Sequence, residues 1–114
     1  MNESPIFSRV YDLLRWLITA TVKFSRQQRF VLAAALQRSA FELQEQLICA
    51  AYSPQPLLLL KQADASLTVL RARLRLARDL ALLDKGQYFH VAAMVNEIGR
   101  LLGGWIKKED RNKV

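Results

Sequence analysis

Apolar residues recur every three or four positions along almost the whole chain, and this spacing limits the possible fold more than any other feature. The first such stripe consists of Ile6, Val10, Leu13, Leu17, Ala20 and Phe24. Side chains at this spacing lie on one face of an α-helix. The chain has only four Gly and three Pro, whereas a β-sandwich of its length needs many more turn residues. The pattern therefore predicts an all-α protein.

Turn signals divide the pattern into four helices. Ser4 before Pro5 is typical of a helix start, because Ser caps the free N–H groups and Pro suits the first helical position. Ser25 is expected to cap the second helix, and Phe30 to begin its buried stripe. Residues 53–56 and 84–86 are interpreted as helix stops. We expect helices over residues of about 5–23, 27–52, 57–83 and 87–106, with a charged and frayed tail over residues 107–114.

Four helices with short loops predict a single domain over residues 1–114, folded as an antiparallel up-down-up-down four-helix bundle. The apolar surface is wider than one small bundle can hide, and four large aromatic residues do not fit together in its core: Trp16, Tyr52, Phe89 and Trp105. We therefore expect a homo-oligomer.

Three glycines, Gly99, Gly103 and Gly104, lie inside the last helical pattern. Each glycine in a helix costs about 1 kcal/mol relative to Ala, so its presence needs an explanation. Close packing against a neighbouring helix is one explanation, and a subunit interface is the other.

The residues that most enzymes use are scarce. His90 is the only imidazole and Cys49 the only thiol, so a disulfide and a Cys/His zinc site are both excluded within one chain. We expect Cys49 to be a small buried residue and His90 to be a half-buried structural one. The carboxylates form no catalytic motif, and Asp79 is expected to pair with Arg75 one helical turn away. These features predict a protein that is not an enzyme and binds no cofactor or metal.

The sequence offers no membrane signal. The longest stretch without charged residues, 46–60, contains two prolines and is shorter than the roughly 18 to 20 apolar residues of a spanning helix. Residues 1–5 lack the basic segment of a signal peptide. We expect a cytoplasmic protein with no membrane partner.

Positive charge is in excess and clustered. Seventeen Lys and Arg face ten Asp and Glu, for a net charge of +7. One cluster comprises Lys23, Arg26, Arg29 and Arg38; a second comprises Arg71, Arg75 and Arg78 on one helical stripe, with Arg73 on the other side; a third comprises Lys107, Lys108, Arg111 and Lys113. One interpretation is salt-sensitive binding of nucleic-acid phosphates. The others are a merely solvated basic surface and, third, a cationic membrane-surface role.

Three segments resemble one protein family. Residues 23–30 read KFSRQQRF, close to the family's K-F-P-R-x-x-R-F turn except that Ser25 stands where proline is frequent. Residues 70–83 form the arginine-rich helix, and residues 97–107 read EIGRLLGGWIK, the most specific part. Together they resemble the accessory variability determinants of diversity-generating retroelements, over residues of about 6–107. The broader relatives are four-helix proteins encoded in intervening sequences of 23S ribosomal RNA genes.

The resemblance implies a non-enzymatic protein that forms a homopentameric barrel. Such proteins bind the retroelement's reverse transcriptase and its template RNA or DNA, and they support mutagenic copying. By matching position, the contacts to nucleic acid or polymerase would come from Arg26, Arg29, Arg71, Arg75, Arg78 and Arg100. Subunit packing would come from Gly99, Gly103, Gly104 and Trp105. The alternative is a structural protein of the intervening-sequence type with no retroelement role.

Overall fold

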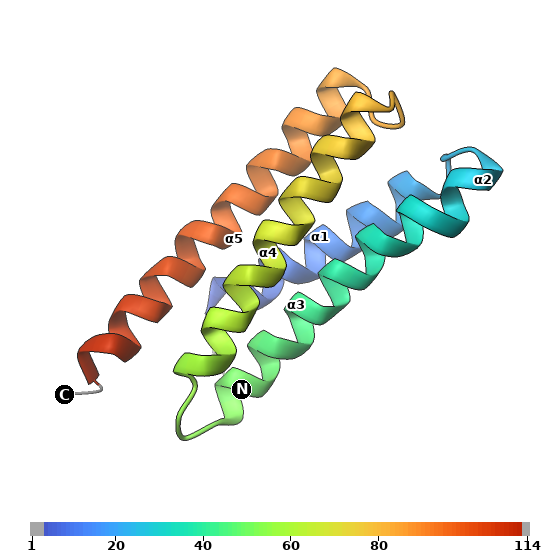
Figure 1. Cartoon of the computed structure of the whole chain (residues 1–114). Coiled ribbons are helices and arrows are strands. Elements are labelled where there is room, and N and C mark those ends of the chain that lie inside the picture. Colours follow the sequence, from blue (N-terminus) through green and yellow to red (C-terminus); the bar gives the residue numbers. More distant parts are fainter. Residues whose placement is uncertain (1–3, 113–114) are drawn as a thin grey trace.

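The computed structural model describes residues 4–112, and every regular element in that range is a helix (Figure 1). The elements are α1 (Pro5–Thr21), α2 (Arg26–Gln28), the π-helical segment η1 (Arg29–Ala33), α3 (Ala34–Tyr52), α4 (Leu57–Asp79) and α5 (Lys85–Asn112). Because α2, η1 and α3 follow one another without a break, the chain has four long helical rods. The all-α prediction is confirmed.

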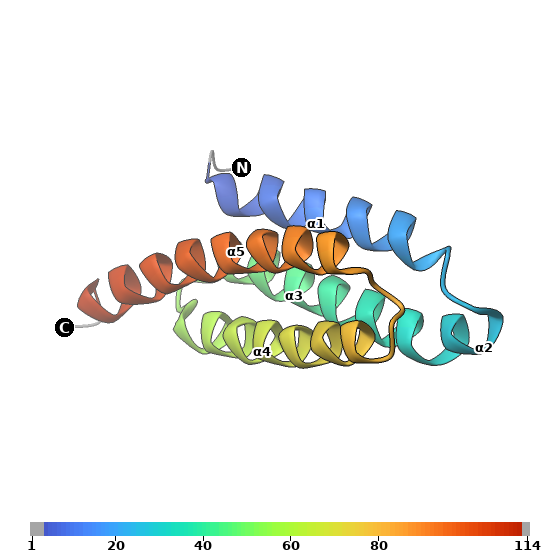
Figure 2. The same ribbon diagram turned by 90° about the horizontal axis from the view of Figure 1, so that it is seen from above.

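The four rods form a ring in which each packs against two neighbours. α3 packs against α4, α4 against α5, and α1 against both α3 and α5. The α1–α2 connection and the α4–α5 loop lie at one end of the molecule, whereas the α3–α4 loop and the described ends of the chain lie at the other (Figures 1 and 2). The described part measures 49 × 23 × 22 Å.

The core is built from the apolar stripes that the spacing predicts. Leu13, Leu43, Leu67 and Ile98 are each fully buried and come from the four different rods. Burying one such side chain contributes about 1.5 to 3 kcal/mol. The stripes of α1, α4 and α5 are buried over most of their length, so helical periodicity alone identifies most of this core.

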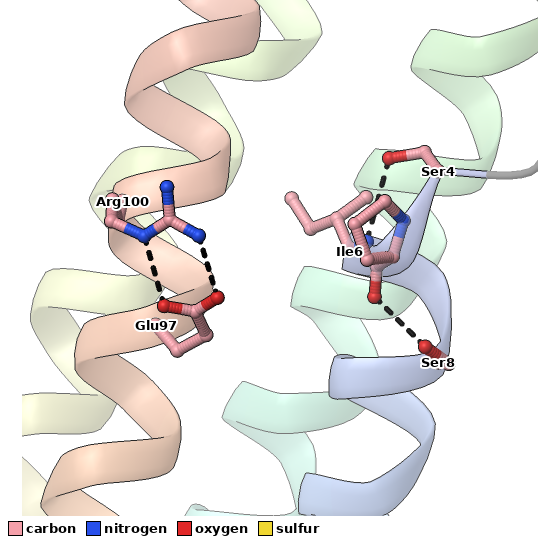
Figure 3. A network of polar contacts seen from close by, with 6 residues as sticks. Ser4, Ile6, Ser8, Glu97 and Arg100 are labelled. Atoms are coloured by element: carbon pink, nitrogen blue, oxygen red, sulfur yellow. Dashed lines mark hydrogen bonds and ion pairs between the residues drawn. The ribbon is translucent and has the colours of Figure 1, made fainter.

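The start of α1 agrees with its sequence signal. Ser4 is the N-cap residue, and its hydroxyl accepts a hydrogen bond from the N–H of Ile6 at 3.4 Å (Figure 3). Pro5 occupies the first helical position, where it has no intrahelical hydrogen bond to lose. Capping depends on a few neighbouring residues, which is why the sequence predicts it well.

The second rod differs from the uninterrupted α-helix that we expect over residues 27–52. η1 is wider than an α-helix, so the three-four spacing does not hold through it. Leu32 and Ala33 consequently face the core, whereas Phe30 is 77% exposed. The prediction that Phe30 belongs to the buried stripe is wrong. Ser25 stands at the N-cap position, but its hydroxyl makes no capping hydrogen bond within residues 4–112.

The third helix ends earlier than predicted, at Asp79 rather than near residue 83. Ala81 has a φ of 61°, the left-handed conformation that ends many helices and usually belongs to Gly. The N–H of Ala81 bonds to the carbonyl of Arg78, and the N–H of Leu82 to that of Ala77, each at 2.9 Å. These two bonds form a Schellman motif. The helix stop therefore lies at Ala81, three residues before the stop that the sequence pattern predicts at Asp84.

Asp84 begins α5 instead of ending α4. Its carboxylate accepts a hydrogen bond from the N–H of Gln87 at 2.8 Å, and the Gln87 side chain accepts one from the N–H of Asp84 at 2.9 Å. This reciprocal pair is a capping box. Interpreting residues 84–86 as a helix stop was wrong, because the Asp-x-x-Gln spacing already indicates a start. Gly86 lies in the first turn of α5.

The charged tail is helical as far as the structure describes it. α5 continues to Asn112, so a frayed segment beginning at residue 107 is a wrong prediction. Ile106 is partly buried and packs against the core. Lys113 and Val114 lie outside the described residues.

The large aromatic residues divide into two groups. Trp105 packs edge-on against Phe7 with ring centroids 6.1 Å apart, and Trp16 lies 5.8 Å from the His90 ring. Tyr52 and Phe89 are 73% and 60% exposed. The expectation that these four aromatic residues do not share one core is confirmed.

The outward side of α4 carries a second apolar stripe. Its members are exposed and recur at helical spacing: Leu58, Ala65, Val69, Ala72 and Leu76. Leu58 is 68% exposed and Leu76 is 48% exposed. The described chain leaves this stripe uncovered, although its spacing matches that of a helix-packing face.

Candidate nucleic-acid interface

Arg71 and Arg75 of α4 line a cavity of about 170 Å³ between α4 and α5, which we call the notch. The other lining residues are Leu74, Tyr88, Ala92, Val95 and Asn96. Arg71 is half-buried, whereas Arg75 is exposed. The stripe predicted from the sequence thus faces the neighbouring helix, and the structure brings two of its arginines to one cavity.

Arg71 depends on Gly99 of α5. A β-carbon on Gly99 would lie 2.6 Å from the Nη2 atom of Arg71, which is closer than such a carbon can approach. The missing side chain of Gly99 therefore leaves the space in which the Arg71 guanidinium lies. Gly99 therefore packs within the chain against side chains of α4, those of Arg71 and Leu67.

Arg78, the third member of the stripe, already has partners. Its Nε–H donates to the Asp79 carboxylate at 3.0 Å, and its guanidinium carbon lies 4.6 Å from the centre of the Tyr88 ring. The predicted pairing of Asp79 with Arg75 is wrong, because Asp79 is used by its immediate neighbour. Arg75 is consequently left without an ion pair in the described part of the chain.

Arg73 points to the opposite side of α4, as its position on the helix predicts. Its Nη1 atom donates to the carbonyl of Ala35 at 3.0 Å and to the hydroxyl of Ser39 at 2.6 Å. Ser39 is buried, so this arginine satisfies a polar group in the α3–α4 interface. Arg73 is therefore a structural residue rather than a surface contact.

Arg100 lies on α5 and is bound to Glu97. Its Nε and Nη2 atoms donate to the two carboxylate oxygens at 2.9 and 2.7 Å (Figure 3). These hydrogen bonds from Arg100 are the main cause that lowers the pKa of Glu97, with smaller contributions from the charges of Arg100 and Arg9. A guanidinium held in this fork offers fewer free donors to an anion than Arg71 or Arg75 does.

Arg26 and Arg29 lie at the corner between α1 and α3, and both are exposed. Exposed apolar side chains adjoin them in sequence: Val22, Phe30 and Val31, with exposures of 60%, 77% and 69%. Sequence reasoning identified the arginines but missed the apolar residues, because regular helical spacing assigned Phe30 to the core. No signal in the sequence marks the π-helical segment that turns it outward.

The residues predicted for subunit packing have different surroundings. The space beside Gly99 is occupied by the guanidinium of Arg71, and Trp105 packs against Phe7 of its own chain. A β-carbon on Gly103 or Gly104 would meet no described atom within 4 Å. Packing inside the chain therefore accounts for Gly99 and leaves Gly103 and Gly104 without an explanation of that kind.

Residues with possible chemistry lie apart from the notch. Cys49 is exposed on α3, so the prediction of a buried thiol is wrong: its position falls outside the Leu43, Leu47 and Ala50 stripe. His90 is exposed, so the prediction of a half-buried residue is wrong, although its ring lies beside that of Trp16. Within residues 4–112, no three His, Cys, Asp or Glu side chains gather in a way that could hold a metal ion.

None of the helices described for residues 4–112 combines the length and apolar character needed to cross a membrane.

Comparison with known proteins gives one family. No curated protein matches the chain. The family model described as bAvd-like matches residues 6–109, which include nearly the whole of the four rods, both arginine sites and the glycines of α5. This match confirms the resemblance on which the expectations about the arginines depend. The chain belongs to the bAvd-like family.

Proposed function

We propose that this chain is a non-enzymatic accessory protein of a diversity-generating retroelement. In this role it binds the element's reverse transcriptase and its template RNA or DNA, and so supports mutagenic copying. The observation that carries the proposal is the family match over residues 6–109, because the bAvd-like family consists of accessory proteins and is not a known enzyme family.

The unpaired arginines support the nucleic-acid part of the proposal. Arg26, Arg29, Arg71 and Arg75 make no ion pair within residues 4–112, while Arg73, Arg78 and Arg100 have partners. Guanidinium groups without a counter-charge bind phosphates well, since their planar fork matches two phosphate oxygens. Contacts to phosphates position a protein on nucleic acid without reading the base sequence, so we expect binding that is largely independent of sequence.

Salt dependence tests this binding quantitatively. If four arginines each displace one counterion from single-stranded nucleic acid, the slope of log K against log salt is about −3 per chain. Affinity for a labelled oligonucleotide then falls about 50-fold between roughly 50 and 200 mM salt. Binding that is absent at low salt, or that does not change with salt, contradicts the proposal.

The polymerase contact needs its own experiment. The purified reverse transcriptase of the same element is expected to co-purify with the wild-type chain. Reversing Arg26 and Arg29 to Glu is expected to weaken nucleic-acid or polymerase binding while circular dichroism shows an unchanged helix content, because both side chains are exposed. Failure of the wild-type chain to bind the polymerase would favour an intervening-sequence type of protein instead.

We also propose that the antiparallel up-down-up-down bundle assembles with copies of itself, as a pentamer if it follows the resemblance. The exposed stripe of α4 supports this, since a partner helix would bury Val69 and Leu76. Gly103 and Gly104 support it because they leave room for a close approach.

Light scattering tests the assembly. We expect a mass several times the 13.1 kDa of one chain. Leu76→Glu is expected to reduce that mass without loss of helix content, whereas Ile18→Glu, an exposed apolar position on α1, is expected to leave it unchanged. A wild-type mass of one chain would contradict self-association.

A further inference from the structure

Two arginines of α4 stand out because nothing in the described chain neutralises them. Arg71 and Arg75 make no hydrogen bond or ion pair within residues 4–112, although the other two arginines of α4 do. Arg71 is also half-buried, and taking a charge partly out of water without a partner is unfavourable. An anion between the two guanidinium groups would remove this cost.

We propose that the notch holds one phosphate group of a nucleic-acid backbone between Arg71 and Arg75. This inference rests on the nucleic-acid binding proposed above, and it adds which guanidinium groups bind a backbone phosphate. The Asn96 amide also lines the notch and can donate to a phosphate oxygen. The rest of the lining consists of Tyr88 and the apolar side chains of Leu74, Ala92 and Val95.

The size of the notch agrees with a single group. Its volume of about 170 Å³ is below the roughly 300 to 1,000 Å³ of sites that enclose a whole small molecule. A phosphodiester presents two unbridged oxygens and one negative charge. Two guanidinium forks on the same stripe can each take one oxygen, which gives more than one hydrogen bond per phosphate.

Gly99 leaves room for the Arg71 guanidinium at the position from which it would bind the phosphate. The Arg71 guanidinium lies in the space that a side chain at residue 99 would occupy, so α5 restricts where this long side chain can go. A side chain that is already placed loses less conformational freedom on binding. Arg78 lies over the ring of Tyr88, which lines the same cavity, but its charge is balanced by Asp79.

Gly99→Ala separates this placement from charge, because it removes no positive group. The added β-carbon would lie 2.6 Å from Nη2 of Arg71, and the flexible end of that side chain has to move. Gly86→Ala is the matched control on the same helix, since its β-carbon would meet only Asp84 Oδ1, at an ordinary 3.4 Å.

Arg71→Gln tests the charge itself and keeps the proposal testable if the glycine variant folds poorly. Its control is Arg15→Gln, which removes one positive charge from the exposed surface of α1. Circular dichroism checks the fold of all four variants.

The experiment measures binding of fluorescent hexauridylate by anisotropy at about 50 mM salt. We expect Gly99→Ala and Arg71→Gln each to weaken binding about tenfold, which corresponds to the loss of one charged hydrogen bond. Gly86→Ala and Arg15→Gln are expected to change it less than about threefold. In parallel, the Nε–H signals of Arg71 and Arg75 are expected to shift in nuclear magnetic resonance spectra as hexauridylate is added.

The contrary outcomes are distinct. If the wild-type chain binds hexauridylate but all four variants bind equally well, the notch is not the phosphate site, while the proposed function stands. If inorganic phosphate shifts the two arginine signals at the same concentration as hexauridylate, the site serves free phosphate rather than a backbone. If the wild-type chain does not bind hexauridylate at all, nucleic-acid binding itself is contradicted, and a protein carboxylate becomes the partner to test.

Discussion

The Nη2 atom of Arg71 lies 2.6 Å from the point where a β-carbon of Gly99 would stand. The two residues come from the arginine-rich and the glycine-containing segments, which sequence analysis assigned to different roles. In the structure they form one arrangement, because the glycine makes room for the arginine. Residues 97–107, the most specific part of the family resemblance, therefore help to position an arginine of the basic surface.

Gly99→Ala is expected to stabilise the fold slightly even as it disturbs the notch. Replacing Gly by Ala inside a helix contributes about 1 kcal/mol, and displacing the end of Arg71 takes back part of it. We expect the free energy of unfolding to rise by about 0.5 kcal/mol in urea denaturation. A fall of more than about 1 kcal/mol would mean that Arg71 cannot move and is fixed by the α4–α5 packing.

Arg73→Met is expected to lower the free energy of unfolding by about 1 to 3 kcal/mol, because the buried Ser39 hydroxyl loses its charged donor. Arg75→Met is the control: it removes the same charge from an exposed site on the same helix and should cost less than about 0.5 kcal/mol. Urea denaturation of both variants measures the difference. Equal stabilities would show that Arg73 is not structural.

Ala81→Gly is expected to stabilise the protein by about 0.5 to 1 kcal/mol. Ala81 has a φ of 61°, where a β-carbon costs about 1 to 2 kcal/mol, and the greater freedom of unfolded Gly offsets part of this gain. Ala93→Gly at an exposed position inside α5 should instead destabilise by about 1 kcal/mol. Thermal unfolding of the two variants should move in opposite directions, and a parallel loss would contradict the strain at Ala81.

Arg100→Gln is expected to raise the pKa of Glu97 toward the ordinary value of a glutamate, because the hydrogen bonds from Arg100 are the main cause of its lowering. Since the folded pKa lies below the unfolded one, this pair stabilises the fold above the unfolded pKa. That contribution disappears as the pH falls through the folded pKa. Carbon-13 titration of the Glu97 carboxyl measures the shift. Arg15→Gln should leave it in place, and an unchanged pKa in Arg100→Gln would contradict the assignment.

Local chemistry made much of the fold predictable. The stripe of α1 and its Ser4–Pro5 start were foreseen because helical spacing and capping depend on residues within a turn or two. The end of α4 is not predictable in this way. Ala81 adopts the left-handed conformation that ends the helix, and this conformation is signalled in a sequence by Gly rather than by Ala. The capping box of Asp84 and Gln87, by contrast, is a local Asp-x-x-Gln signal that the sequence does carry.

The amino-acid sequence by itself determined that the chain forms four helical rods and carries arginines on one side of the third. Only the tertiary structure decided which of those arginines remain available to a partner. Arg73 is engaged because Ser39 lies opposite it on α3, and Arg71 is placed because Gly99 lies opposite it on α5. The facing residues come from other helices, so their positions follow from how the helices pack rather than from any local pattern.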